Sequence, residues 1–100
     1  MRRRGSTIAV YMMASQKNGT LYCGVTSDLS ARILSHREGR GSAFAKRYGC
    51  KRLVWYEPHE LIVEAIGREK IIKKWRRQWK IDLIESANPE WRDLWFELTD

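Results

Sequence analysis

The chain has 100 residues, 43% of them hydrophobic, and its 19 Lys and Arg outnumber its 12 Asp and Glu to give a formal net charge of +7. This length suits one domain with one compact core. Cys23 and Cys50 are too few for a disulfide framework and lack the spacing of a zinc site, so we expect reduced, packed thiols. No stretch approaches the roughly 20 apolar residues of a membrane span and no signal segment stands out, so the sequence predicts a cytoplasmic protein.

The positive excess favours an anionic partner, because Lys and Arg neutralise phosphates and release their counterions. The alternative is a solvated basic surface that serves solubility. We expect residues 1–6, which include three consecutive arginines, to be flexible, and residues 7–100 to form a single domain.

The first elements expected are two strands at residues 7–13 and 20–26, which are rich in apolar and β-branched residues. The polar segment between them contains Asn18-Gly19, so the sequence predicts a β-hairpin. Because strand side chains alternate between two faces, Tyr11 and Tyr22 can meet on one face of this hairpin.

Gly24 interrupts the second strand, where a glycine packs no side chain and costs conformational entropy. Such a residue marks either a β-bulge or a close approach by a ligand or another backbone. Taken singly, Tyr11 and Tyr22 have a simpler explanation, since strand tyrosines commonly place the hydroxyl at the surface.

A helix is predicted over residues 29–38, with Asp28 as its N-cap and Gly39 as its stop. Arg32 and His36 are four residues apart and therefore project from the same helix face. An exposed polar face would explain them. The alternative is chemical: arginine holds a phosphate bidentately and a nearby histidine orients or deprotonates a water, which suits phosphodiester cleavage.

The remaining elements predicted are a mobile basic loop at 39–42, a strand at 51–57 ended by Pro58, helices at 60–75 and 76–85, and a short helix or turn within 91–98. Asn88-Pro89 ends the last long helix. This order of strands and helices predicts a small α/β layer fold.

Glu69 is the least expected residue for mere folding, because helical spacing places its carboxylate within an apolar stripe made by Ile62, Ala65, Ile66 and Ile72. Buried carboxylates are paired, protonated or bound to a metal. An internal salt bridge to a neighbouring arginine is the structural alternative. For Glu64, an exposed pair with Arg68 is a sufficient explanation.

A basic run follows Glu69 and is interleaved with tryptophans: Lys70, Lys73, Lys74, Trp75, Arg76, Arg77, Trp79 and Lys80. The pattern is typical of a face that follows a phosphate backbone and offers rings for base stacking. A solvated helix with its tryptophans in the core is the alternative.

Together, a tyrosine in each arm of a hairpin, an Arg-x-x-x-His helix and a carboxylate on a later helix resemble the GIY-YIG nuclease family. Ala9-Val10-Tyr11 stands in place of the first motif, and Tyr22-Cys23-Gly24 in place of the second. Over residues 7–95 the chain is similar to short stand-alone bacterial members, which resemble the nuclease domain of the excision-repair incision subunit. Further matching segments are 46–49, 51–57, 64–70 and 88–94.

The resemblance implies a three-stranded, mainly antiparallel sheet flanked by helices. It also implies that Glu69 binds one Mg²⁺ or Mn²⁺, that Arg32 contacts the scissile phosphate, and that His36 helps to activate the nucleophile. Tyr11 and Tyr22 would line the water and the metal. The nucleic-acid contacts expected are Arg40, Lys46, Arg47, Lys70, Lys73, Lys74, Arg76 and Arg77.

The leading hypothesis is therefore a metal-dependent endonuclease that hydrolyses DNA, branched or damaged DNA included, in repair or recombination. In it, Tyr11 orients or deprotonates the attacking water, with His36 as proton acceptor, and Tyr22 positions the water or the phosphate. Some family members carry a lysine after the second motif, where this chain has Val25 and Thr26. That departure supports the alternative of a catalytically weak or inactive nucleic-acid-binding module. A protein that binds an acidic partner is a third reading, and the sequence leaves DNA versus RNA and the oligomeric state open.

Overall fold

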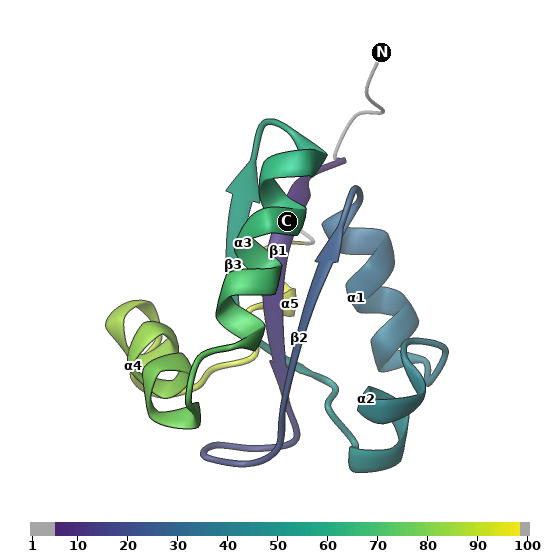
Figure 1. The fold of residues 1–100 in the computed structure, drawn as a ribbon. Helices are drawn as coiled ribbons and strands as arrows, with labels where there is room; N and C mark the ends of the chain where they lie inside the picture. The colour runs from purple at the N-terminus through teal and green to yellow at the C-terminus, as the bar shows by residue number, and fades with distance from the viewer. Residues whose placement is uncertain (1–5, 99–100) are drawn as a thin grey trace.

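A computed structural model describes residues 6–98 (Figure 1). Its central element is the strand β1, on which the rest of the fold packs. The sheet has three antiparallel strands in the order β2-β1-β3, with helices on both faces, and this confirms the α/β layer fold. The expectation for residues 1–5 lies outside the described residues. The elements are β1 (Ile8–Ala14), β2 (Leu21–Thr26), α1 (Leu29–Arg37), α2 (Ala43–Tyr48), β3 (Arg52–His59), α3 (Ile62–Lys73), α4 (Arg77–Ala87) and α5 (Trp95–Leu98).

β1 is buried on both faces, because residues 9–14 are fully inaccessible to solvent. Alternation sends Val10 and Met12 to a core shared with α3 and α4, and sends Tyr11 and Met13 to a second core shared with α1 and α2. The sheet therefore separates two helical layers (Figure 1).

The predicted hairpin is confirmed, and its register decides which side chains meet. Tyr11 pairs with Gly24 and Met13 with Tyr22, so both tyrosines lie on the face covered by α1 and α2. The guanidinium of Arg77 fastens the turn from outside by donating to the carbonyls of Asn18 and Gly19 at 2.8 and 2.7 Å.

β3 differs from its prediction, because Pro58 does not end it. The strand continues to His59, and Pro58 pairs with Ala9 at the edge of the sheet. An edge strand tolerates proline, since one side of its backbone needs no ladder hydrogen bond. A register shift between Met12 and Met13 leaves Val54 as the extra residue of a bulge.

The helices follow the predictions in part. Asp28 caps α1 by accepting from the backbone N–H of Ala31, and Gly39 follows the helix with a left-handed φ of 78°. α2 was not predicted. On α3 the buried face is Ala65, Glu69 and Ile72, whereas Ile62 and Ile66 are 40% and 37% exposed, so the expected stripe is narrower than its spacing indicated. Within the described residues, no helix is both long and apolar enough to cross a bilayer.

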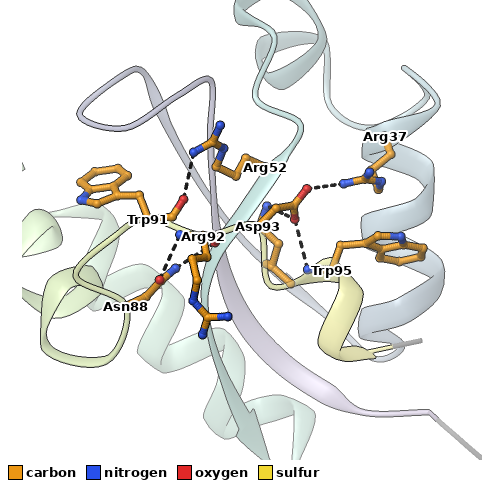
Figure 2. Close-up of polar contacts among 8 residues, drawn as sticks. Arg37, Arg52, Asn88, Trp91, Arg92, Asp93 and Trp95 are labelled. Atoms are coloured by element: carbon orange, nitrogen blue, oxygen red, sulfur yellow. Dashed lines mark hydrogen bonds and ion pairs between the residues drawn. The ribbon is translucent and has the colours of Figure 1, made fainter. Parts of the chain in front are cut away.

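The segment after α4 wraps around the edge of β3 (Figure 2). The side-chain amide of Asn88 donates to the carbonyls of Val54 and Arg92. Asp93 accepts from the backbone N–H of Leu53 and from Arg37, and the N–H of Leu94 donates to the carbonyl of Leu53 at 2.8 Å. Trp91 fills the first core and Leu94 reaches the second.

Candidate active site

Gly24 is where the two tyrosine motifs touch. A Cβ at this position would lie 2.5 Å from the Tyr11 hydroxyl and 2.6 Å from its Cζ, so only glycine lets the Tyr11 ring lie over β2. The Tyr11 and Tyr22 rings are 6.3 Å apart between centroids. The register around Gly24 is unbroken, so the glycine marks a close approach rather than a bulge, and the approaching group is the Tyr11 side chain rather than a backbone.

Tyr11 is held by two side chains of α1. Its hydroxyl shares a 2.9 Å hydrogen bond with Nε2 of His36 and accepts one of 3.3 Å from Nε of Arg32. The one-turn spacing of Arg32 and His36 thus aims both at the same oxygen, as the sequence predicted for a shared face. His36 is 3% exposed, and Tyr22 lies 5.3 Å from its ring centroid.

Burial sets the proton affinities of this cluster. Desolvation raises the pKa of Tyr11 to about 12, although the hydrogen bond from Arg32 acts in the opposite direction. Desolvation, assisted by the positive charge of Arg32, lowers the pKa of His36 to about 4. At neutral pH the site therefore holds a protonated phenol beside an uncharged imidazole.

Gly41 closes the cluster from the loop between α1 and α2. A Cβ at this position would lie 2.1 Å from Nδ1 of His36, so the backbone of Gly41 packs directly against the imidazole. Nδ1 is buried and has no hydrogen-bond partner within the described residues. The loop therefore fixes the ring by packing rather than by a second hydrogen bond.

Glu69 lies on the buried face of α3. α3 packs on the other face of the sheet, where Glu69 influences Cys23, the β2 residue that follows Tyr22. Glu69 is buried, with 8% of the residue exposed, and its Oε2 lies 2.6 Å from Nζ of Lys73, one turn later. The hydrogen bond to Glu69 is the main cause of the raised pKa of Lys73, and the smaller contributions of Tyr22 and Cys23 place its ammonium near β2.

Comparison with known proteins agrees with this arrangement. The family model described as the GIY-YIG catalytic domain matches residues 7–82, which include every residue of the cluster and Glu69. The chain belongs to the GIY-YIG family. A GIY-YIG domain is a nuclease domain, so its general function is of the nuclease type.

The relatives of this GIY-YIG domain are small proteins. It is 35% identical to a UPF0213 protein of Staphylococcus epidermidis over 70 residues, 70% of this chain and 85% of that protein. It is 38% identical to UPF0213 proteins of Staphylococcus saprophyticus, over 71% of this chain and 87% of that one, and of Staphylococcus aureus, over 68% and 83%. No solved structure gives a significant match.

The donor set of this GIY-YIG domain is sparse for a metal. Among residues 6–98, no group of three or more His, Cys, Asp or Glu side chains converges. One carboxylate is nevertheless compatible with Mg²⁺, which uses one or two carboxylates and completes its shell with waters and substrate phosphates. The ammonium of Lys73 shows that the Glu69 carboxylate already holds a cation here. The residues therefore fit a single divalent ion whose other ligands come from water and substrate.

The structure gives the expected basic contacts different surroundings. Arg40 is paired with Glu38 at 2.6 Å, and Arg77 is engaged by the hairpin turn. Arg68, expected to pair with Glu64, instead donates to Glu57 of β3. The other expected nucleic-acid contacts are all exposed, namely Lys46, Arg47, Lys70, Lys73, Lys74 and Arg76.

One tryptophan of the basic run packs against the core, and the other is exposed as a ring for base stacking would be. Trp75 is half-buried against the first core, whereas Trp79 is 49% exposed, with its ring 6.2 Å from that of Trp75. Arg68 and Arg76 lie over these two rings.

Sequence reasoning missed three participants. Gly41 stood within a predicted loop and had no sequence signal that linked it to His36. Lys73 was assigned to a phosphate-binding face, although its i,i+4 spacing from Glu69 is that of an ion pair. α2 was overlooked, yet Ser42 and Gly49, a cap and a left-handed stop seven residues apart, mark its ends.

Proposed function

We propose that this chain is a metal-dependent endonuclease that hydrolyses phosphodiester bonds of DNA, with a role in repair or recombination. The observation that carries the proposal is the pair of hydrogen bonds that join Tyr11 to Arg32 and His36, built over Gly24 of β2. A purely structural core does not need such a group, because it brings the hydroxyl of a buried tyrosine together with a buried imidazole and a half-buried guanidinium.

Arg32 is the phosphate-binding group of this proposal. Its Nε is engaged by Tyr11, which fixes the plane of the guanidinium. The terminal nitrogens are then pre-oriented for the oxygens of the scissile phosphate, which arginine binds as a planar fork. Holding that phosphate against the tyrosine cluster converts a bimolecular attack into one within a bound complex.

Tyr11 and Tyr22 orient the attacking water. A phenol with a pKa of about 12 keeps its proton at neutral pH, so the resting Tyr11 acts through hydrogen bonding. Desolvation disfavours both the phenolate of Tyr11 and the imidazolium of His36, so transfer of the proton from Tyr11 to His36 is unfavourable in the resting site. Deprotonation of Tyr11 by His36 stays a prediction that requires the bound substrate to change this balance.

Glu69 is the proposed anchor for Mg²⁺ or Mn²⁺. Such an ion supplies Lewis-acid stabilisation of the charge that develops on the leaving oxygen. Release of Lys73 from Glu69 would free its ammonium, which is half exposed on a flexible stem, to bind a phosphate of the substrate.

The test compares cleavage of end-labelled single-stranded, duplex and branched DNA in Mg²⁺, Mn²⁺ and EDTA. Glu69→Gln, Tyr11→Phe and Arg32→Lys are each expected to abolish metal-dependent cuts. Glu64→Gln is the matched control, because Glu64 lies on the same helix and is exposed. Equal binding without cleavage by any of these proteins, in any metal, would refute the nuclease and leave a binding module.

A further inference from the structure

An aromatic strip leads from the candidate active site to the surface of α2. Phe44 and Tyr48 lie one turn apart on this helix, with ring centroids 4.8 Å apart, and each is 46% exposed. On its inner side Phe44 lies over Tyr22, with 6.3 Å between centroids and 30° between ring planes. The rings of Tyr22, Phe44 and Tyr48 therefore form one series, here called the aromatic strip, that begins beside His36.

The strip stands on a fixed support. Ser42 caps α2 by accepting from the backbone N–H of Ala45 at 3.0 Å, and Gly49 ends the helix in the left-handed conformation, with φ of 67°. Ala45 and Cys50 anchor it in the second core, where they are 2% and 1% exposed. The small residue Ala45 is thus the buried face of α2, and Cys50 anchors the chain just after the helix, while the large rings are turned outward.

The surroundings of the strip carry positive charge. Lys46 and Arg47 are exposed on the same helix, and the Arg47 guanidinium lies 5.5 Å from the centre of the Tyr48 ring. Flat rings exposed next to cations are the combination with which proteins bind single-stranded nucleic acids, stacking bases on the rings and pairing phosphates with the charges. Contiguous exposed apolar surface next to polar groups commonly marks a binding site.

We propose that the aromatic strip holds unpaired nucleobases beside the phosphate bound by Arg32, so that the substrate carries single-stranded or splayed nucleotides where it is cut. A paired base in a duplex is already stacked on its neighbours, and its faces are closed to protein rings. The inference rests on the proposed nuclease function for the position of the phosphate, and it adds the class of substrate.

Binding in EDTA tests the strip apart from chemistry. The full chain is titrated with fluorescein-labelled oligo-dT and with a blunt duplex of equal length, and with oligo-dT carrying 2-aminopurine, whose emission falls on stacking. Phe44→Leu keeps an apolar side chain but removes the flat ring, and we expect about ten-fold weaker oligo-dT binding, the effect of one lost stacked base. Duplex affinity should change less than two-fold, and Phe44→Trp should restore both the affinity and the quenching.

Two controls separate stacking from charge and from other rings. Lys46→Ala combined with Arg47→Ala should weaken both probes equally and lower the salt dependence of both. Trp79→Leu removes an exposed ring on α4 and should leave the preference for oligo-dT unchanged. The proposal is refuted if Phe44→Leu weakens both probes alike or neither, or if the preference depends on Trp79 and not on Phe44.

The same proteins distinguish failure of this inference from failure of the nuclease function. Cleavage of a duplex with a splayed end by wild type, with no effect of Phe44→Leu on single-strand binding, would overturn the strip alone. A Phe44-dependent preference for oligo-dT, without cleavage in Mg²⁺ or Mn²⁺, would confirm that the aromatic strip binds unpaired bases and would refute the proposed nuclease function.

Discussion

Adding one methyl group at Gly24 should disable the site while leaving the fold intact. The new Cβ would lie 2.5 Å from the Tyr11 hydroxyl, about 0.9 Å inside the 3.4 Å at which ordinary contact begins, so the ring has to move. A displacement of that size lengthens the 2.9 Å bond to His36 beyond hydrogen-bonding range. Overpacking a core costs about 1–3 kcal/mol, and Gly→Ala returns about 0.5–1 kcal/mol through the unfolded chain.

We therefore expect Gly24→Ala to lose about 1–2 kcal/mol of stability and about 100-fold in cleavage rate, the effect of misplacing a reacting group by 1 Å. Urea unfolding measures the first quantity, and initial rates of cleavage of end-labelled DNA measure the second. Gly67→Ala is the matched control, because a Cβ there meets open space on α3, so it should be neutral or stabilising. In a Tyr11→Phe background Gly24→Ala should keep most of its cost in stability, since Cζ of the ring would still lie 2.6 Å from the new Cβ. Wild-type stability and rate in Gly24→Ala would refute the packing argument.

Three further predictions follow from other contacts. The pKa of His36 is lower in the folded protein than in the unfolded chain, so the neutral imidazole contributes stability above pH 6.5, about 3 kcal/mol at most, and this contribution is lost as pH falls toward 4. His36→Gln should flatten that part of the pH profile of stability measured by urea unfolding, and an unchanged slope would contradict the assignment. Asp93→Ala removes the acceptor for the N–H of Leu53 and the ion pair with Arg37, and it should cost about 3 kcal/mol of stability in the same assay. Glu97→Ala breaks only an exposed pair and should cost less than about 0.5 kcal/mol, so equal costs would be inconsistent with a structural role for Asp93. Arg77→Ala should destabilise the fold by about 1 kcal/mol without changing the salt dependence of DNA binding, because Arg77 holds the hairpin turn. Arg76→Ala should reduce the salt dependence of DNA binding without changing stability. The opposite pattern would disprove the assignment of Arg77 to the hairpin and of Arg76 to the substrate.

The strands and the core of the site were accessible from sequence because their signals are local. Alternation fixed which face Tyr11 and Tyr22 share, and the spacing of Arg32 and His36 placed them on one side of α1. A glycine inside an apolar strand signalled close contact, although the sequence did not say that Tyr11 makes it. These inferences need only the geometry of one element or of one hairpin.

What the sequence did not yield depends on contacts between distant segments. α2 is six residues long, too short for a helical period to appear, and Pro58 is tolerated because β3 lies at an edge. The spacing of Ile62 and Ile66 indicated burial, but α3 turns a narrower face to the sheet. Arg68 had a candidate partner on its own helix and found Glu57 on another element instead.

The wrap of residues 88–95 around β3 has a consequence for where the domain can be cut. The family match ends at residue 82, yet the backbone groups of Leu53 are satisfied by Asp93 and Leu94, and Trp91 fills the first core. A chain shortened to the matched region would expose an unpaired strand edge beside a vacated apolar hollow. Open edges of that kind pair with the edges of other molecules, so the shortened protein should self-associate or aggregate more readily than the longer chain. Residues 88–95 thus cover the edge of β3 and prevent further strands from pairing with it there.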